Sequence, residues 1–538
     1  VPPMTALDRR SLIRGAAVTA SALAGGVVAG APAARATTAS PTGDKVLPAD
    51  PRYLHLTTGN NQRFVARPQY VKMIRSAADA AAALGEAFRA GKRVSVRSGG
   101  HCFADFVCRP DVDVILDLSE MTCVGYDDTM KAFAVEPGAR LLPVYEKLYK
   151  GWGVTLPGGV CYGVGAGGHI AGGGYGVLSR RDGLVVDHLY GVEVVTVDAA
   201  GTTRIVKATR DASSPHRDLW WAHTGGGGGN FGIVTRYWLR SPGSTRTAPA
   251  ATQLPAPPAR VLSHVQAIPW SALDRTSFTR LVKNFSTWHE QNSAPDSPYK
   301  ELGSILNVYT SASAALNLVT QIDADLPDAQ ARLDAYLNAV LDGVTTVRAP
   351  ARILPWLQQT TMVATINPVL NDPTLRGAHK SAYVRTAFTD AQLDALYASM
   401  TTTAYRNPRA MLVLFSFGGQ VNAVAPDATA IPQRSSVVKM LYQTFWTNPA
   451  EDAVHQGWLR GLYAQVHAAT GGVPGLDGQT DGCYINYPDN DMADPAVNTS
   501  GIPWQTLYYK GNHPRLQRVK KAYDPSNYFR HPMSVTPA

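Results

Sequence analysis

A short motif near residue 100 has the composition of an anion-binding loop. Arg97 to His101 reads Arg-Ser-Gly-Gly-His, and it ends a stretch, Arg93 to Arg97, that alternates like a β-strand. Because glycine has no Cβ, two adjacent glycines allow backbone N–H groups to crowd around an anion such as a pyrophosphate. The motif therefore indicates a phosphate-binding loop. Its alternative is a tight turn followed by a packed histidine.

The second motif is a glycine-rich run from Pro157 to Gly176 that contains a single cysteine, Cys161. Gly163, Gly165 and Gly168 match the dinucleotide fingerprint G-x-G-x-x-G. That fingerprint needs a strand before it, a helix opening within it and an acidic residue about twenty positions later. Further glycines follow instead of a helical run, which argues against a Rossmann site. So many glycines cost folding entropy, and they make sense where the backbone must lie flat against a large ligand.

A third motif, Cys483 to Asp489, carries two tyrosines in the order Cys-Tyr-Ile-Asn-Tyr-Pro-Asp. As a β-strand it would place Tyr484 and Asn486 on one face and Ile485 and Tyr487 on the other. A phenol serves as a general base only if positive charge or hydrogen bonding lowers its pKa from about 10. The alternative is a buried strand tyrosine with a satisfied hydroxyl.

Several other kinds of chemistry find no support in the sequence. No H-E-x-x-H or comparable spacing of ligands is present, so no metal site is expected. No G-x-S-x-G segment is present, which argues against a serine hydrolase. No spacing favours a particular disulfide among the remaining cysteines, which are Cys102, Cys108, Cys123 and Cys483.

Length and composition limit the class of protein. The chain has 538 residues, of which 45% are hydrophobic and 17% are charged. It is too long for one compact domain and too apolar for a disordered chain, so two domains are expected. After the first forty positions there is no uncharged apolar stretch of about 18 residues, which excludes an integral membrane protein. The basic residues form no stripe, so no nucleic-acid partner is expected.

The N-terminal segment has the features of an export signal. Arg9 and Arg10 precede a mildly hydrophobic run from Gly15 to Ala31, and Ala34 to Ala36 supplies a small-x-small cleavage site. This combination is typical of bacterial twin-arginine signals, so residues 1–36 are predicted to be removed on secretion. The alternative is a disordered basic tail. Removal takes away four arginines and one aspartate, which lowers the formal net charge from +9 to +6.

Periodicity predicts a mixed order of helices and strands. Helices are expected at 77–90, 142–149, 277–291, 329–341 and 453–468, and strands at 93–97, 112–118, 132–135, 233–239, 305–309 and 411–417. Residues 192–206 read as a hairpin that turns at 198–201, and 514–524 form a last segment. The Pro-, Ala- and Ser-rich stretch 241–260 is the best linker. A glycine-rich domain is thus expected before a second domain of sheet and helices.

Together these blocks resemble the flavin-dependent oxidases of the vanillyl-alcohol-oxidase/para-cresol-methylhydroxylase (PCMH) superfamily. Within it the chain is similar to the berberine-bridge-enzyme-like branch with doubly linked FAD, and looks most like actinomycete oxidases of natural-product tailoring, including glycopeptide hexose oxidases. The resemblance covers nearly all of the mature chain, from Asp50 to Phe529, and its most specific part is the pair S-G-G-H and G-G-x-C.

The resemblance implies an α+β fold in two domains. A PCMH-type FAD-binding domain of two α+β subdomains is expected at 47–245, and a substrate domain with an antiparallel sheet covered by helices at 246–485. A C-terminal berberine-bridge-like segment at 486–538 is expected to return to the FAD domain.

The resemblance also assigns residues to the cofactor. His101 matches the histidine bonded to the flavin 8α-methyl carbon, and Cys161 matches the cysteine bonded to C6 of the isoalloxazine. Val164 falls where the family's oxygen gatekeeper sits, and a small β-branched side chain there goes with oxidases. The other cofactor-binding positions are Arg97, Ser98, Gly99 and Gly100 in the pyrophosphate loop, Gly165, Gly167, Gly168 and His169 along the flavin, and Asn527 in the C-terminal segment.

For catalysis the resemblance points to the third motif. Tyr487 matches the base that takes the proton of a substrate hydroxyl while hydride leaves to flavin N5, and Tyr484, expected on the opposite strand face, is the second candidate. Aromatic stripes on the substrate segments are as often core as pocket. The residues expected to bind substrate are Tyr175, Phe415, Phe417, Met440 and Tyr442.

The implied function is that of a secreted FAD-dependent oxidase that takes hydride from an alcohol carbon of a sugar, glycoside or secondary metabolite and reduces O₂ to H₂O₂. Two alternatives stay open. One is oxidative ring formation or desaturation of a polyketide or alkaloid by the same flavin chemistry. The other is a non-enzymatic role, in which the flavoprotein binds a drug for resistance.

Overall fold

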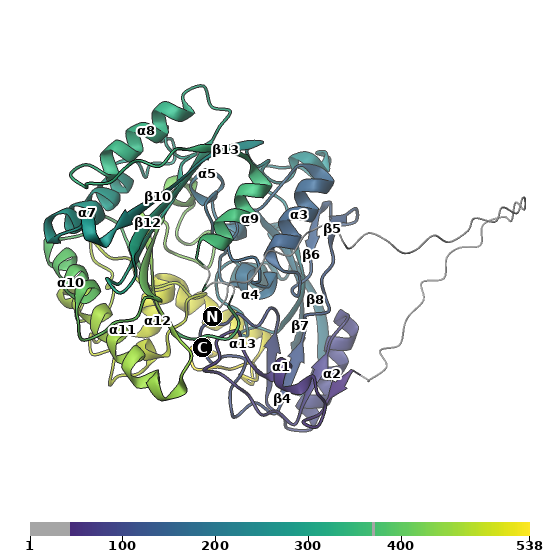
Figure 1. Ribbon diagram of the computed structural model, residues 1–538. Coiled ribbons are helices and arrows are strands. Elements are labelled where there is room, and N and C mark those ends of the chain that lie inside the picture. The colour runs from purple at the N-terminus through teal and green to yellow at the C-terminus, as the bar shows by residue number, and fades with distance from the viewer. Residues whose placement is uncertain (1–43, 368, 370–371) are drawn as a thin grey trace, which may run out of the picture. The chain divides into compact units, whose positions relative to one another are not determined.

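Three β-sheets and the helices packed on them make up the described part of the protein, as the computed structural model shows (Figure 1). The structure describes residues 44–367, 369 and 372–538, so the predicted export signal at 1–36 lies outside the described residues. The predicted α+β class is confirmed. Boundaries at 245 and 485 stay predictions, because residues 44–538 cluster into one unit.

The first sheet has four strands in the order β1 (Lys45–Val46), β2 (Tyr70–Met73), β4 (Val114–Asp117) and β3 (Val94–Arg97). The last three are parallel, and β1 is antiparallel. Helix α1 (Tyr53–Thr57) precedes β2, and α2 (Ala77–Arg89) connects β2 to β3. Ser76 caps α2 by accepting a hydrogen bond from the backbone N–H of Asp79. Strand β3 ends at the predicted phosphate-binding motif, which places this loop at the sheet's edge.

The second sheet is antiparallel and has the order β5 (Val124–Asp127), β6 (Ala132–Val135), β9 (Ile233–Leu239), β7 (Leu189–Val197) and β8 (Thr203–Thr209). The predicted hairpin is confirmed, since β7 and β8 pair across a turn at 198–201. Gly201 takes φ +83° there, a left-handed conformation that favours glycine. Four helices accompany this part of the chain: α3 (Leu141–Trp152), α4 (Ala166–Ala171), α5 (Ser179–Asp182) and α6 (Arg217–Ala222).

The third sheet has seven antiparallel strands, and its inner face lines a cavity between the sheets. Its order is β13 (Arg352–Pro355), β10 (Arg260–Pro269), β12 (Ala315–Asp323), β11 (Gly303–Tyr309), β15 (Ala410–Ser416), β16 (Val438–Trp446) and β14 (Arg376–Val384). Helices α7 (Arg275–Gln291), α8 (Ala329–Val340), α10 (Asp390–Thr401) and α11 (Asp452–Val466) pack together on its outer face (Figure 1). Helix α9 (Trp356–Ile366) contacts β10, β13 and α3.

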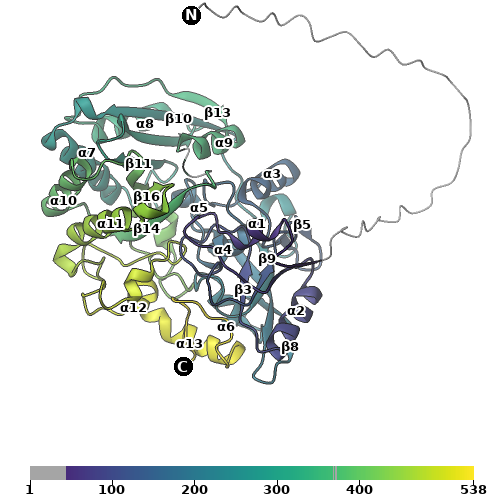
Figure 2. The ribbon, with the colours of Figure 1, turned by 60° about the horizontal axis from the view of Figure 1, so that its bottom comes forward.

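The C-terminal segment returns to the first part of the chain. Helices α12 (Trp504–Tyr509) and α13 (His513–Tyr523) follow the seven-stranded sheet, and α13 packs beside α6 (Figure 2). The buried Lys520 ammonium donates to the backbone oxygen of Asn230, and the Tyr528 hydroxyl donates to the backbone oxygen of Lys92. These contacts hold the C-terminal segment against the first part of the chain.

One predicted strand is wrong. Residues 483–489 form no strand but a turn, which the backbone N–H of Tyr487 closes by donating to the backbone oxygen of Tyr484 at 2.9 Å. The other predicted helices and strands lie within a few residues of observed ones. Within the described ranges, none of the helices has the length and apolar character needed to span a membrane.

Candidate active site

A cavity of about 330 Å³ lies between the three sheets. Loops that follow β3, the glycine-rich run, residues 227–230 and residues 529–531 line one side of it. The inner face of the seven-stranded sheet lines the other side. The first two motifs of the sequence therefore meet the third motif at one place.

The two glycine motifs touch each other through their backbones. A Cβ on Gly99 would overlap the backbone of Gly165, and one on Gly165 would overlap Gly99 and the Ser98 hydroxyl. The Ser98 hydroxyl donates to the backbone oxygen of Pro137 at 2.6 Å, which fixes the loop. The glycines therefore give two stacked backbone segments along the cavity wall, a surface suited to a long, flat cofactor. The predicted positions that line the cavity are Ser98, Gly99, Gly100, Val164, Gly165, Gly167, Gly168 and His169.

Arg97 does not line the cavity, and its expected contact with pyrophosphate stays a prediction. Its Nη1 lies 2.7 Å from Oδ2 of Asp117, directly opposite on β4, and both side chains are buried. The carboxylate therefore holds the guanidinium behind the loop, where it packs beneath Gly100. Arg97 supports the loop from behind.

Asn527 also lies outside the cavity lining. It occupies a tight turn with φ +50°, in which its backbone N–H donates to the backbone oxygen of Asp524. The turn carries the chain onward, and Phe529, Arg530 and His531 reach the cavity instead. The C-terminal segment therefore lines the cavity through residues 529–531 and not through Asn527.

His101 and Cys161 face the same cavity from different loops. A Cβ on Gly163 would lie 3.1 Å from the His101 Nε2, so the two loops pass close to each other at this glycine. Burial lowers the pKa of His101 to about 4, which leaves its imidazole neutral and nucleophilic. Burial raises the pKa of the Cys161 thiol, and hydrogen bonds from the backbone N–H groups of Gly163 and Val164 oppose that rise. Two side chains able to bond carbon thus face one ligand space.

His169 stabilises the fold of the glycine-rich run. Its Nε2 accepts a hydrogen bond from the backbone N–H of Gly159 at 3.2 Å, and its ring fills the space beside Gly158 and Gly174. Burial lowers its pKa to about 4, so the ring is neutral and can accept this bond.

Tyr487 and Tyr175 share a short hydrogen bond at the junction of the glycine run and the third motif. Their hydroxyl oxygens are 2.5 Å apart, and both residues line the cavity. Tyr484 does not point away from Tyr487, because the turn brings their ring centroids to 5.1 Å. The Tyr484 hydroxyl accepts from the backbone N–H of Gly174 at 3.0 Å and from Asn486 Nδ2 at 3.1 Å. These two hydrogen bonds occupy the Tyr484 hydroxyl, whereas Tyr487 faces the space available to a ligand.

A buried lysine that sequence reasoning missed lies behind these tyrosines. Lys439 Nζ is 2.9 Å from the ring centroid of Tyr484, 3.4 Å from that of Tyr175 and 5.1 Å from that of Tyr487. The side chain is 0% exposed, and Nζ has no hydrogen-bond partner among the described residues. Burial lowers the pKa of Lys439 and raises those of Tyr175 and Tyr487. A lone lysine in the otherwise uncharged stretch 438–446 is the signal that could have revealed it.

Only two of the five residues predicted to bind substrate line the cavity. Phe415 and Tyr175 line the cavity with their rings 5.2 Å apart, and Phe417 packs behind Tyr175 without lining it. Met440 and Tyr442 face the helices, because successive side chains of β16 alternate between the two faces of the sheet. The Tyr442 hydroxyl lies 3.1 Å from Nε2 of His467, just after α11. The cavity-facing residues of this strand are Leu441, Gln443 and Phe445.

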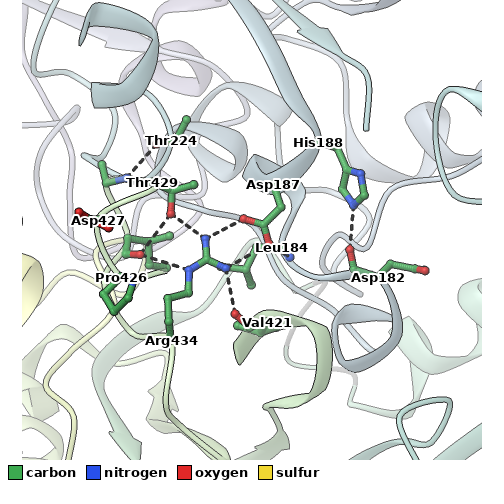
Figure 3. Close-up of polar contacts among 12 residues, drawn as sticks. Asp182, Leu184, Asp187, His188, Thr224, Val421, Pro426, Asp427, Thr429 and Arg434 are labelled. Atoms are coloured by element: carbon green, nitrogen blue, oxygen red, sulfur yellow. Dashed lines mark hydrogen bonds and ion pairs between the residues drawn. The ribbon is translucent and has the colours of Figure 1, made fainter. Parts of the chain in front are cut away.

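A buried ion pair joins the glycine-rich part to the loop before β16 (Figure 3). The Arg434 guanidinium bonds both carboxylate oxygens of Asp187, at 2.7 and 3.0 Å, and also donates to the Thr429 hydroxyl. The backbone N–H of Ala430 donates to the Thr224 hydroxyl at 2.8 Å. These bonds hold the loop beside the residues that carry Tyr175 and Tyr484.

Comparison with known proteins places the chain in a family. An FAD binding domain matches residues 68–207, and a berberine and berberine-like domain matches residues 483–536. The chain is 47% identical to an aclacinomycin-N/aclacinomycin-A oxidase of Streptomyces galilaeus over 92% of this chain and 90% of that protein. It is 31% identical to a hexose oxidase of Chondrus crispus over 90% of this chain and 93% of that protein. A crystal structure of a glycopeptide hexose oxidase complexed with teicoplanin is 48% identical, covers 92% of this chain and 98% of its own, and has a TM-score of 0.86.

The matching domains agree with the cavity. The FAD binding domain includes both glycine motifs, and the berberine-like domain includes the tyrosine turn and the C-terminal residues that reach the cavity. The glycine cradle fits a flavin dinucleotide, and the predicted recognition is confirmed. This chain belongs to the berberine-bridge-enzyme-like family of FAD-dependent oxidases.

Proposed function

We propose that this oxidase converts an alcohol carbon of a sugar or of a glycosylated secondary metabolite to the carbonyl level, with O₂ as the electron acceptor. When bound, FAD accepts a hydride and passes its electrons to O₂, which yields H₂O₂. The observation that carries the proposal is the pair of hydroxyls of Tyr487 and Tyr175, 2.5 Å apart and facing the cavity. An alcohol oxidation needs a group of this kind to receive the hydroxyl proton.

The named relatives support the same substrate class. One is called a hexose oxidase, one is an oxidase of aclacinomycins, and one was crystallised with teicoplanin as a glycopeptide hexose oxidase. The cavity wall of this chain suits a sugar attached to an apolar partner, because apolar side chains surround a few polar groups.

Tyr487 is the general base in this proposal, and the positive charge of Lys439 favours ionisation of its phenol. Burial alone opposes ionisation of a phenol and of an amine, but an ionised pair of the two carries no net charge. The Lys439 ammonium, held against the faces of Tyr484 and Tyr175, favours a negative charge shared by the two hydroxyls of Tyr175 and Tyr487. Tyr487 then receives the substrate proton at its oxygen, and Tyr175 keeps that oxygen in place.

We also propose that FAD is attached to the chain twice, through His101 to the flavin 8α-methyl carbon and through Cys161 to C6. The supporting observation is that both side chains face one cavity across Gly163. Val164, which lines the cavity beside them, is assigned to the approach of O₂.

Export through the twin-arginine pathway remains a proposal from the sequence. It predicts that replacing Arg9 and Arg10 by lysine retains the protein inside the cell, and fractionation of a producing bacterium measures this. Equal export of the replaced and the original protein would contradict it.

Peroxide release tests the proposed function. The flavin-loaded protein is incubated with free hexoses, disaccharides and aclacinomycin A, and H₂O₂ is measured. Turnover of a sugar or glycoside is expected. Reduction only by a metabolite without an oxidisable alcohol would instead establish ring formation or desaturation, and tight drug binding without bleaching of the flavin would establish a binding role.

A further inference from the structure

The tyrosine turn, residues 483–489, is attached to the free edge of the seven-stranded sheet. Strand β14 is the last strand of that sheet, and residues 479–482 continue along its open side. The backbone N–H of Tyr383 donates to the backbone oxygen of Gly482 at 3.0 Å, and the backbone N–H of Asp481 donates to that of Tyr383 at 2.9 Å. The chain therefore enters the tyrosine turn directly from this strand edge.

Two neighbouring residues of β14 hold the tyrosine turn from opposite faces of the sheet. Ser381 is on the cavity side, because its partner on β16 lines the cavity, and its hydroxyl accepts from the backbone N–H of Tyr484 at 3.0 Å. Lys380 is on the helix side, and its ammonium donates to Oδ2 of Asp489 at 2.6 Å. Both ends of the tyrosine turn are thus bonded to one strand.

The attachment at Lys380 is a buried group of charges. Its side chain is 3% exposed, and the ammonium also donates to Oδ2 of Asp491 at 2.7 Å. Arg460 of α11 donates to both carboxylate oxygens of Asp491, at 2.6 and 2.8 Å. A buried ammonium without a carboxylate is costly, and so is a buried carboxylate without a cation. The tyrosine turn therefore cannot move away from β14 without leaving buried charges unpaired.

A proline links the anchored carboxylate to the proposed base. The chain runs Tyr487-Pro488-Asp489, so one residue separates the two side chains. The proline ring fixes its own φ and also restricts the backbone of the residue before it. A shift of Asp489 is therefore passed on to Tyr487. The Tyr487 hydroxyl lies 2.5 Å from that of Tyr175, and a displacement of about 1 Å would break this hydrogen bond.

We propose that Lys380 is a positioning residue for the proposed base. Through Asp489 it holds the tyrosine turn in the place where the hydroxyls of Tyr487 and Tyr175 meet. Lys380 and Asp489 do not line the cavity, so they act through Tyr487 and not on the substrate. This inference rests on the proposed function, because it explains how the base is kept in position.

The double variant Lys380→Met, Asp489→Asn tests the inference, because it removes both charges of the attachment and leaves Asp491 paired with Arg460. Anaerobic reduction of the bound flavin is followed by stopped-flow absorbance with aclacinomycin A or glucose, whichever reduces the wild-type protein faster. The limiting reduction rate is expected to fall about 10- to 100-fold, because a small misplacement of a catalytic group costs this much. The half-saturating substrate concentration should stay within about twofold, since the changed residues do not line the cavity.

The matched control is the double variant Arg376→Met, Asp452→Asn. It removes another ion pair between β14 and α11, in which Nε of Arg376 lies 2.7 Å from Oδ1 of Asp452, and this pair includes no residue of the tyrosine turn. The control should reduce its flavin within about twofold of the wild-type rate. A loss as large as that of the Lys380 variant would show that any broken ion pair at this strand slows the reaction, and it would overturn the inference.

Tyr487→Phe separates positioning from general support of the fold. In this background the Lys380→Met, Asp489→Asn changes should slow reduction by less than about threefold, because Lys380 acts through the hydroxyl that is already missing. Equal slowing in both backgrounds, or no slowing in either, would overturn the role of Lys380 while the oxidase activity stands. A Tyr487→Phe flavin reduced at the wild-type rate, or a wild-type flavin that neither substrate reduces, would overturn the proposed function and the inference with it.

A crystal structure of the Lys380→Met, Asp489→Asn variant gives a readout that does not depend on turnover. The hydroxyl oxygens of Tyr175 and Tyr487, 2.5 Å apart in the intact protein, are expected to separate by about 1 Å. An unchanged distance would overturn the inference and leave the proposed function standing. If this variant does not fold, Asp489→Asn alone, which leaves Lys380 paired with Asp491, should show the same changes at a smaller size, and their absence would also overturn the inference.

Discussion

The hydroxyls of Tyr175 and Tyr487 and the Lys439 ammonium form one unit at the scale of single residues. The unit is neutral when the lysine and one phenol are both ionised, and both phenols line the cavity with their hydroxyls hydrogen-bonded to each other. In the proposed mechanism, the activity of Tyr487 as a base depends on the charge of Lys439.

Lys439→Met tests this dependence through pH. Burial raises the pKa of Tyr487, and the hydrogen bond from Tyr175 opposes that rise. In the proposal a charged Lys439 opposes it further, so removing the lysine is expected to move the phenol pKa upward. The pH at which flavin reduction by substrate reaches half its maximal rate is expected to shift upward by about 1 to 3 units. Anaerobic stopped-flow absorbance at several pH values measures it. A lower rate with an unshifted profile would show that Lys439 only supports packing.

A second prediction concerns His101 and Cys161. Acid-denatured protein is expected to stay yellow, and mass spectrometry is expected to find flavin on peptides that contain each residue. His101→Ala and Cys161→Ala each keep one link, because the two side chains reach the cavity from separate loops, and the double variant keeps none. Release of the chromophore from the wild-type protein by acid would contradict the attachment.

At the scale of elements, the direction in which a side chain points could be predicted only where the local backbone conformation was predicted correctly. The alternation that placed Tyr484 and Tyr487 on opposite faces assumed a strand, and a turn closed by one backbone hydrogen bond put both rings on one side. For β16 the strand itself is real, but Met440 and Tyr442 were assigned to the wrong face. A continuous apolar run does not show which face meets the helices, because both faces of this strand are buried.

The loop before β16 depends on the ion pair of Arg434 and Asp187. Arg434→Met leaves a buried carboxylate unpaired, and the free energy of unfolding is expected to fall by about 3 to 5 kcal/mol. Urea unfolding followed by flavin fluorescence measures this loss. The double variant Arg434→Met, Asp187→Asn removes the stranded charge, so it should lose less than the single variant. Equal stability of Arg434→Met and the wild type would show that the pair contributes nothing.

At the scale of the whole molecule, the sequence predicted the parts better than their contacts. The two glycine motifs could be recognised in the sequence. Glycine is required there because the backbones of Gly99 and Gly165 are in contact and leave no room for a Cβ. Arg97 and Asn527 match a family pattern in sequence, but neither residue lines the cavity. Gln443 and His531 reach the cavity, and Lys439 reaches the tyrosines behind its wall, only through packing between distant segments, and no local pattern records such packing.

Buried neutral histidines make the stability of the molecule pH-dependent. Burial lowers the pKa of His379 and His467 to about 3, below the value of about 6.5 in an unfolded chain. The unfolded chain therefore takes up these protons first, and the free energy of unfolding falls as the pH drops from about 6.5 toward 3. At pH 5 the loss is about 2 kcal/mol for each histidine. The thermal midpoint of the flavin-loaded protein is expected to drop between pH 7 and pH 5, and His467→Gln should reduce that drop. A drop of the same size in both proteins would contradict the assignment to His467.

The central claim is that Tyr487 takes the proton of a substrate hydroxyl while hydride passes to the bound FAD. Anaerobic reduction of the flavin by an accepted glycoside measures this step directly, because no O₂ chemistry follows. Tyr487→Phe removes only the hydroxyl, so bound flavin and substrate affinity should survive while the reduction rate falls about 10²- to 10⁴-fold. Tyr484→Phe should do less, since its hydroxyl serves the backbone of Gly174. Reduction of the Tyr487→Phe flavin at the wild-type rate would contradict the claim.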